Sequence, residues 1–342
     1  MAGIDDREKK ILLAVIQSYI NLGFPVGSRY LSKKHDFGLS SASIRNVMSD
    51  LEEMGYLVQP HTSSGRVPTD KGYRLFVEEL LGGGIASNAA LLSLLDSFNL
   101  DVVNDLNELI NSITKAFSGY SHYLGVALST TMENSILRKI EMFGYKDNMI
   151  VILLLTEEGV VRHKIVSSYA ILNQQDLSRI SSYLTSEFGG VTLKEIRNAL
   201  AEDLYKERAM RDDLLAKALE FCKYAIFSFN ADVFITGMSE LINLPDFCDV
   251  QRIKELSRAV EDKVKIVGLL DDILEIEGVQ VFIGSEAFKD NEALSVVAST
   301  FYEKGRPFGV FGLIGPQRMD YASAISIVDT SAKFMSKHLD NR

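Results

Sequence analysis

Residues 40–69 read SSASIRNVMSDLEEMGYLVQPHTSSGRVPT, and this stretch decides the fold of the amino-terminal part of the chain. Ser40 and Ser41 offer side-chain oxygens to the unpaired amides of a first helical turn, so a helix is expected to begin there. Gly55 fits the left-handed position that ends a helix. Apolar residues between these ends recur at three- and four-residue spacing and predict one buried face: Ile44, Val47, Met48, Leu51 and Met54.

A short hairpin follows the predicted helix. Residues 56–59 have the pattern of a short strand, and residues 63–65 supply the turn. Arg66 and Val67 begin the return strand, which Pro68 ends because proline cannot donate to a ladder. We therefore expect Arg66 to lie at the tip of a wing beside the helix.

The flanking residues complete a small module. An apolar face over residues 11–20 predicts a first helix, and Ser28 is a candidate cap for a second, short helix. Thr69 is a candidate cap for a fourth helix after the hairpin. The order helix, helix, turn, helix, wing predicts an N-terminal winged helix-turn-helix domain over residues 1–82.

The polar face of the predicted third helix carries side chains that suit base edges. Arginine pairs with guanine, asparagine pairs with adenine, and small residues allow close approach or touch a thymine methyl group. Arg45 is our first choice as a base-reading residue, and Asn46 is the second. Further candidates on this helix are Ser41, Ala42, Ser43 and Ser49. Candidates for contacts with the DNA backbone or minor groove are Lys33, Lys34, His61, Thr62, Ser63, Ser64 and Arg66, of which His61 could equally be a surface residue without a role.

Charge distinguishes this module from the rest of the chain. Residues 1–75 hold ten Lys and Arg against eight Asp and Glu, whereas the whole chain has a net charge of −10, which leaves −12 for the remainder. A slightly basic head on an acidic body is expected when only the head meets phosphate. The same helix pattern also occurs in plain three-helix packing units and in winged helices that bind proteins, and these would show no salt-dependent DNA affinity.

Two separated segments carry a family resemblance. PVGSRYLSK and LSSASIRNVMSDLEEMGYLVQPHTSSGRVPTDKGYR near the start, with VFIGSE and GVFGLIGPQRMDYASAISIVD near the end, resemble the bacterial heat-inducible transcription repressor family, HrcA. The resemblance covers essentially the whole chain. It implies a negative regulator of heat-shock (chaperone) operons that binds the CIRCE inverted-repeat operator as a homodimer. It also implies that the GroEL-type chaperonin keeps the repressor active, and no cofactor is expected.

Beyond the head, alternating apolar residues predict an antiparallel meander, then a helix over residues 174–188. The expected strands are 124–128, 136–145, 149–155 and 160–166, and later 279–283, 295–302 and 309–314. Asp320 is a candidate cap for a final helix. A sheet flanked by helices predicts a multidomain α+β fold. The resemblance implies a GAF-like domain in two parts, residues 120–190 and 276–342.

The interval 191–275 interrupts the strand pattern and is densely charged and mainly helical, as expected of an inserted domain. The resemblance assigns it to dimerisation. Its apolar residues, including Phe227 and Phe229, fit an interface, but such residues are more often simple core. Arg318 could be an interdomain or intersubunit contact, with Asp320 beside it, or part of a capped turn.

The glycine run Gly82 to Gly84 predicts a hinge, followed by a helical connector that ends near residue 119. The joint could adapt the spacing of the DNA-binding heads to an operator, or it could be a plain linker. The sequence leaves these two interpretations open.

Motifs for catalysis are missing, and the five histidines have no ligand spacing, so we expect neither an enzyme nor a metal site. The charged start lacks the apolar region of a signal peptide, and the longest apolar runs are too short to span a bilayer. Cys222 and Cys248 stand alone, as in reduced proteins. We expect a cytoplasmic bacterial protein, associated with the nucleoid through its operator and not with membrane. The alternative is a metabolite-responsive winged-helix regulator with a ligand in the GAF-like domain.

Overall fold

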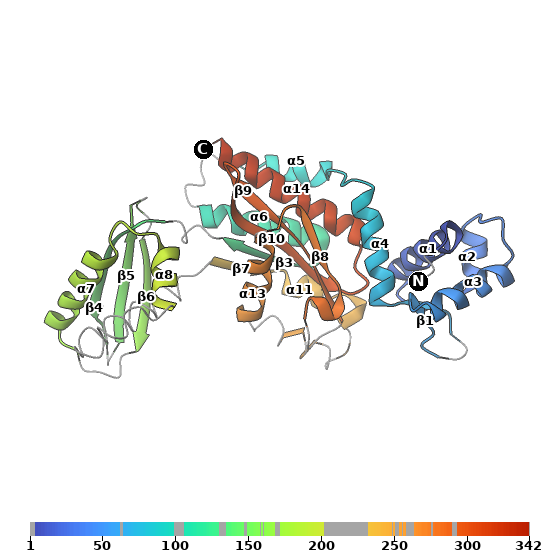
Figure 1. Cartoon of the computed structure of the whole chain (residues 1–342), viewed down its shortest axis with the longest axis horizontal. Helices are drawn as coiled ribbons and strands as arrows, with labels where there is room; N and C mark the ends of the chain where they lie inside the picture. The colour runs from blue at the N-terminus through green and yellow to red at the C-terminus, as the bar shows by residue number, and fades with distance from the viewer. Residues whose placement is uncertain are drawn as a thin grey trace. The chain divides into compact units, whose positions relative to one another are not determined.

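The protein is an assembly of helices and antiparallel strands that divides into two compact units. A computed structural model describes residues 4–61, 64–98, 106–129, 135–146, 149–157, 159, 161–167, 172–201, 232–247, 249, 253–254, 256–257, 263–274, 276–288 and 293–341. The first unit comprises Met1–Leu128 and Val233–Arg342, and the second comprises Ser129–Asp232. The fold is mixed α+β, as predicted (Figure 1).

The first six elements of the first unit form a small helical head. They are α1 (Asp6–Leu22), α2 (Ser28–Lys34), α3 (Ser41–Glu53), β1 (Leu57–Val58), β2 (Val67–Pro68) and α4 (Asp70–Gly82). Ser40 and Thr69 cap α3 and α4, accepting from the amides of Ser43 and Gly72. The predicted cap of α2 was wrong, because Gly27 occupies that position and no side chain caps the helix.

Helix α3 ends as its sequence predicts. Gly55 has φ +78°, its amide donates to the carbonyl of Glu52, and the amide of Tyr56 donates to the carbonyl of Leu51, both at 2.9 Å. These two bonds satisfy carbonyls that the helix leaves without an internal partner. The turn directs the chain from α3 straight into the hairpin.

The hairpin itself is shorter in its strands than predicted. β1 and β2 pair antiparallel over two residues each, with Leu57 opposite Pro68 and Val58 opposite Val67. The return strand begins at Val67 and ends with Pro68 as its last residue, whereas the prediction started it at Arg66 and placed Pro68 just after it. Residues 59–66 separate the two strands, so the connection is longer than the predicted turn over residues 63–65.

The rest of the first unit is a five-stranded sheet with helices. Its strands, in the order β7-β3-β10-β9-β8, are β7 (Asp232–Thr236), β3 (Leu124–Ser129), β10 (Arg306–Pro316), β9 (Leu294–Glu303) and β8 (Val279–Phe282). The helices are α5 (Ala89–Asp96), α6 (Leu106–Ser121), α11 (Met238–Ile242), α13 (Lys263–Leu274) and α14 (Tyr321–Asp340), with short 3-10 turns η1 (Pro245–Phe247) and η2 (Gly284–Glu286). We call this part the sheet domain.

Both sides of this sheet are covered. All of β3 and the first eight residues of β9 are buried, so neither face of these strands meets solvent. Helix α14 lies along the sheet with α5 and α6 nearby (Figure 1). Asp320 caps α14 by accepting from the amide of Ser323, which confirms the predicted start of the last helix.

The second unit is a smaller sandwich of one sheet and two helices. Its antiparallel strands β4 (Leu137–Gly144), β5 (Met149–Thr156) and β6 (Val161–Ser167) follow one another in the sheet, with α7 (Gln174–Phe188) and α8 (Leu193–Ala201). The buried side chains of β4 and β5, such as Ile140 and Ile152, pack with Leu177 and Leu184 of α7 in a separate hydrophobic core. Residues of opposite parity lie on the other face of the sheet.

Two predictions about domain organisation were wrong. β3 pairs within the five-stranded sheet and not with β4, so the predicted meander is two sheets. The inserted unit is therefore Ser129–Asp232 and includes strands, whereas the sequence pattern places the insertion at residues 191–275. Strand β7 also lies in that interval, at the edge of the first sheet. Alternation identifies strand faces but carries no information about which strands pair.

The glycine run that is predicted to form a hinge lies at the end of α4. Gly82 is the last residue of α4, and Gly84 has φ +85°, a conformation that favours glycine. The next residues are bound to α14: the hydroxyl of Ser326 donates to the carbonyl of Ala86 at 2.6 Å, and the amide of Asn88 donates to Thr330 Oγ1 at 2.9 Å. The chain beyond the glycines is thus attached to the sheet domain.

Two buried tyrosines lie where α4 meets α14, and replacing each with phenylalanine should have a different effect on the free energy of unfolding. The rings of Tyr73 and Tyr321 lie 5.8 Å apart, and burial raises the pKa of both phenols. Tyr321 donates to the carbonyl of Gln317 at 2.7 Å, but the hydroxyl of Tyr73 has no hydrogen-bond partner among the described residues. Because an unpaired buried hydroxyl costs free energy, we expect Tyr73→Phe to keep or raise the free energy of unfolding, by up to about 1 kcal/mol. Tyr321→Phe should lower it by about 1–2 kcal/mol in the same urea titration, and equal losses would contradict this assignment.

No helix in the described parts of the chain combines the length and apolar character needed to cross a bilayer.

Candidate nucleic-acid interface

The candidate interface is built around the polar face of α3. Ile44, Val47, Met48 and Leu51 are buried in the head, which fixes the rotation of the helix. Ala42, Arg45 and Asn46 consequently face solvent, while Ser41, Ser43 and Ser49 are partly exposed. The side chains predicted to read bases therefore share the uncovered side of one helix.

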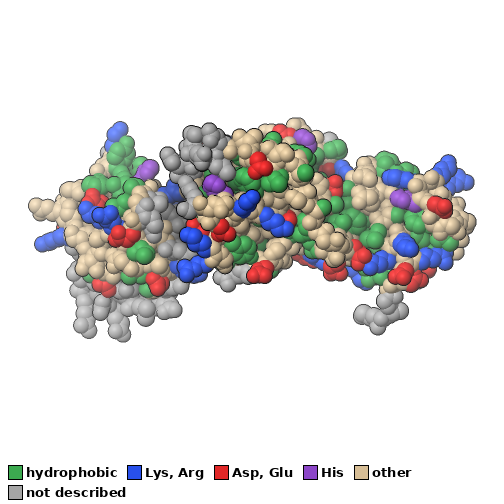
Figure 2. Space-filling view, turned by 90° about the horizontal axis from the view of Figure 1, so that it is seen from above, with side chains coloured by type: hydrophobic (Ala, Val, Ile, Leu, Met, Phe, Trp, Pro, Cys, Tyr) green, Lys and Arg blue, Asp and Glu red, His purple; other side chains and the backbone are tan. Residues whose placement is uncertain are grey.

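A groove separates α3 from the hairpin. It has a volume of about 350 Å³ and is lined by Val26, Gly27, Ser28, Arg45, Met48, Gln59, Ser64, Gly65 and Arg66. Arg45 and the hairpin loop thus border the same hollow from two elements. Figure 2 shows Lys and Arg side chains over this end of the first unit.

The structure corrects the position of Arg66. This residue does not lie at the hairpin tip: it directly precedes β2, and its amide and carbonyl exchange 2.9 Å hydrogen bonds with the carbonyl and amide of Val26. Its Nε atom lies 2.8 Å from Glu52 Oε2, and only 15% of its side chain is exposed. In the free protein Arg66 is therefore bound to α3 and does not extend toward solvent.

The loop between the strands is held by its own polar groups. Gln59 Nε2 donates to the carbonyl of Ser64 at 3.0 Å. The amide of His61 donates to Ser64 Oγ at 3.0 Å, and Ser64 Oγ donates to the carbonyl of His61 at 2.7 Å. His61 itself is exposed. Thr62 and Ser63, also candidates for DNA contact, lie outside the described residues.

The remaining candidates of the head lie on α2. Lys33 and Lys34 are exposed at its C-terminal end, where cations are favoured by the helix dipole. Lys34 Nζ lies 5.4 Å from the centroid of the Tyr30 ring. Both ammonium groups are thus available to solvent close to the turn that leads into α3.

Arg318 occupies the junction between the head and the sheet domain. Its Nε and Nη2 atoms donate to the two carboxylate oxygens of Asp246 at 2.6 and 2.8 Å, and Nη1 donates to the carbonyl of Ile20 at 3.1 Å. Ile20 lies in the last turn of α1, whose carbonyls lack partners within the helix. A guanidinium from the sheet domain therefore caps a helix of the head.

The backbone around Arg318 accommodates this contact. Gly23, at φ +73°, ends α1 against the guanidinium, and a Cβ atom built there would lie 3.1 Å from Arg318 Cζ. A cleft of about 710 Å³ lies beside the pair. Asp320 caps α14, and its amide donates to the hydroxyl oxygen of Tyr123 at 2.9 Å. Phe227 and Phe229, the other predicted contact residues, lie outside the described residues.

Helix α4 supplies further contacts across this junction. Gln317 Nε2 donates to Asp70 Oδ1, and Arg74 forms an ion pair with Glu286. Arg74 also donates to the carbonyl of Val281 at 2.9 Å. The junction thus uses α1 and α4 on one side and the segments around η1, η2 and the start of α14 on the other.

Sequence reasoning missed Glu52, Gln59 and Asp246. No role was assigned to Glu52 or Gln59 from the sequence, and Asp246 lay in the interval expected to be a helical insertion. Their roles depend on contacts that no local pattern encodes. The only local signal was a carboxylate one helical turn after Ser49 on the polar face of α3.

The interior of the sheet domain is filled by aromatic side chains. Phe311 lies 5.5 Å from Phe117 and 4.6 Å from Phe301, measured between ring centroids. Gly309 makes room for this packing, since a Cβ there would lie 2.4 Å from both the Phe301 ring and the carbonyl of Leu128. Among the described residues no cluster of three metal-type side chains is found.

Comparison with known proteins gives consistent matches along the chain. Residues 107–325 match the family model described as HrcA protein C terminal domain. The chain is 38% identical to the heat-inducible transcription repressor HrcA of Geobacter sulfurreducens and 35% identical to that of Thermodesulfovibrio yellowstonii, and each alignment covers 99% of both proteins. A crystal structure described as a hypothetical protein at 2.2 Å resolution shares the fold, with a TM-score of 0.65 and 22% identity over 99% of both chains.

Proposed function

The chain belongs to the HrcA family, and from this premise we propose that it represses transcription of heat-shock operons by binding an inverted-repeat operator of the CIRCE type through α3. The observation that carries the proposal is the exposure of Arg45 and Asn46 side by side on α3 next to the hairpin. In this proposal the head is a winged helix, α3 is its recognition helix, and the hairpin over residues 57–68 is its wing. The sheet domain is the GAF-like domain.

The recognition helix is suited to the major groove. Its buried stripe leaves a row of small and polar side chains outward, and a protruding α-helix of this kind fits a groove about 12 Å wide. Arg45 can donate two hydrogen bonds to a guanine, and Asn46 can pair with an adenine. Lys33, Lys34 and the amides of the wing loop would contact phosphates and so set the position of the helix.

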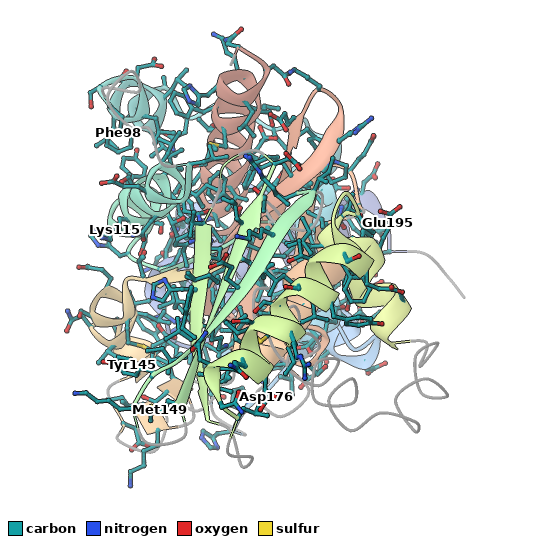
Figure 3. All side chains as sticks on the ribbon, turned by 90° about the vertical axis from the view of Figure 1, so that its left-hand side faces the viewer. Phe98, Lys115, Tyr145, Met149, Asp176 and Glu195 are labelled. Atoms are coloured by element: carbon teal, nitrogen blue, oxygen red, sulfur yellow. The ribbon has the colours of Figure 1, made fainter. Side chains whose placement is uncertain are left out.

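An inverted repeat requires two heads related by a two-fold axis, so we propose that the active form is a homodimer. The second unit supports this, because the face of its sheet opposite α7 presents apolar side chains. Exposed fractions are 40% for Phe143, 56% for Tyr145, 40% for Met149, 59% for Val161 and 48% for Ile165. Figure 3 shows Tyr145 and Met149 at the same end of the β4–β5 hairpin. Apolar side chains gathered on a sheet face are typical of an interaction surface.

We further propose that the GroEL-type chaperonin controls the fraction of active repressor. A partner that favours the DNA-competent conformation raises its population by mass action, so occupation of the chaperonin by unfolded proteins during heat stress would release the operator. This link rests on the family resemblance. It would be overturned if purified protein bound the operator fully and stably without chaperonin across the heat-shock temperature range.

The test of the function is direct binding. Fluorescence anisotropy would be recorded with a labelled CIRCE duplex and a scrambled duplex of equal composition, each with and without chaperonin. The expected result is tighter binding of the operator. Equal affinity for both duplexes, even with chaperonin present, would contradict the repressor proposal.

Arg45→Ala should remove one base interaction and no more. We expect the binding free energy for operator to weaken by about 1–3 kcal/mol, with little change for scrambled duplex, because the arginine side chain that is removed reads a base. Arg7→Ala is the matched control, since Arg7 is an exposed arginine of the same head at the start of α1. If both variants lowered operator affinity equally, Arg45 would be only a source of positive charge.

A further inference from the structure

Glu52 connects the recognition helix to both arms of the wing. It lies in the last turn of α3, and its Oε1 atom accepts from the amide of Gln59 at 3.0 Å. Its Oε2 atom lies 2.8 Å from Arg66 Nε. Because Gln59 follows β1 and Arg66 precedes β2, one carboxylate holds the two ends of the wing loop.

The side chains that make these contacts are partly shielded from water. The exposed fractions of the Arg66 and Glu52 side chains are 15% and 30%. The Gln59 amide makes a charge-assisted hydrogen bond to the Glu52 carboxylate, whereas Arg66 Nε contacts it as an ion pair without hydrogen-bond geometry. Partial burial reduces the screening of both contacts by salt. The pair should therefore persist at physiological ionic strength, unlike a fully exposed ion pair.

The strands of the wing are also anchored to the head, because Leu57 of β1 is buried in the hydrophobic core. β1 and β2 pair with each other over two residues, and Arg66 bonds to Val26, which lies before α2. The bonds between Gln59, His61 and Ser64 are internal to the loop. The contacts of Glu52 with Gln59 and Arg66 join the loop directly to the recognition helix.

A carboxylate at this position has an electrostatic cost for DNA binding. It stands on the helix that approaches the phosphates, one turn beyond Ser49, and it offsets the charge of Arg66. Any duplex, whatever its sequence, should bind more weakly because of it. A group that lowers general affinity while ordering the wing would raise the ratio of specific to non-specific binding.

We infer that Glu52 is a positioning residue that determines DNA specificity, by fixing the wing to the recognition helix through Gln59 and Arg66. The inference rests on the proposed operator binding. In the bound state the fixed wing aligns its loop with the backbone beside the bases that Arg45 and Asn46 contact. The orientation of the wing thus becomes part of sequence recognition, although Glu52 touches no DNA.

Glu52→Gln in the full-length chain tests this inference. The amide oxygen can still accept from Gln59, but the ion pair with Arg66 is removed. We expect affinity for the scrambled duplex to rise about threefold, because one negative charge near phosphate is removed. Affinity for the CIRCE duplex should fall about tenfold, because the wing is no longer fixed. The two affinities thus move in opposite directions.

Glu53→Gln is the matched control. Glu53 is the next residue of α3, and its side chain is exposed to solvent. This substitution removes the same charge, so both duplexes should bind slightly and equally tighter. A variant that merely unfolds the head would lose both affinities together, and circular dichroism would detect the loss of helix.

Wing order can be measured separately because the chain contains no tryptophan. Val58, on β1, is 44% exposed, so Val58→Trp places a single reporter on the wing. Its fluorescence anisotropy should drop when Glu52→Gln is added and stay unchanged with Glu53→Gln. If the two glutamine variants gave the same specificity ratio and the same anisotropy, the role of Glu52 would be refuted while operator binding stood. If the wild type failed to distinguish the duplexes, the proposed function would fail first.

Discussion

Raising the salt concentration from 50 to 200 mM is expected to weaken operator binding by the proposed full-length dimer by about 10³- to 10⁵-fold. Each bound cationic side chain displaces counterions from the duplex, so the logarithm of affinity falls linearly with the logarithm of salt concentration. The head offers Lys33 and Lys34 as exposed cations beside the amides of the wing loop. With about three to five phosphates per head, two heads give the expected slope.

The slope also tests the proposed dimer. A single head would bind half as many phosphates, so the weakening over the same range would be close to the square root of the value for two heads. The measurement is fluorescence anisotropy on the CIRCE duplex at four or more salt concentrations.

Lys33→Ala and Lys34→Ala should each make the plot of log affinity against log salt concentration less steep. The slope should change by about one for every phosphate contact that is lost, without a change in the preference for operator. A flat salt dependence would exclude binding through this basic face.

The boundaries and buried faces of helices could be predicted because cap residues and apolar spacing lie within or next to each helix. Both ends of α7 follow from the sequence, since Asn173 caps it and Gly189 follows it, and α14 begins at its predicted cap, Asp320. The exposed face of α3 follows from helical periodicity once its apolar stripe is recognised. The start of a capped helix and its buried face can be predicted from the cap residue and from the spacing of its apolar residues.

The domain division could not be predicted because it depends on strand pairing. β3 and β4 are neighbours in the chain and both alternate, yet they belong to different sheets. β3 pairs with β10, about 180 residues later, through backbone groups that are the same for every residue type. The alternating pattern by itself therefore predicts one meander.

The candidate site shows the same division. The positions of Arg45 and Asn46 on the surface required only the helix, whereas the pairing of Arg66 with Glu52 required the hairpin to fold back on α3. Arg318 was selected from a family motif, but its partners Ile20 and Asp246 are 298 and 72 residues away. A sequence shows which residues are charged, but it does not show which residue pairs with each charge, because that depends on how distant segments fold together.

Arg318→Met should cost the first unit about 2–4 kcal/mol of its free energy of unfolding. Only 20% of the Arg318 side chain and 18% of the Asp246 side chain are exposed. Removing the guanidinium leaves the Asp246 carboxylate and the Ile20 carbonyl without this partner in a region with little water. The cost is smaller than for a fully buried ion pair, since some solvent reaches both side chains. Urea unfolding followed by circular dichroism measures it.

Lys9→Met provides the control for this loss. Lys9 of α1 pairs with Glu79 of α4 at 2.6 Å, but 33% and 45% of these two side chains are exposed, so the change should cost less than about 1 kcal/mol. The double variant Arg318→Met with Asp246→Leu should recover most of the stability, because no unpaired charge remains at the junction. An Arg318→Met loss as small as that of Lys9→Met would show that the Arg318–Asp246 pair contributes little to stability. With a large loss and recovery, the junction stabilises the head against the sheet domain through a compensated charge. In that case the double variant separates the stability of the first unit from the orientation of the head on the sheet domain. Its free energy of unfolding should be close to that of the wild type. Its affinity for operator should be lower, because α1 no longer has the guanidinium that capped its last turn.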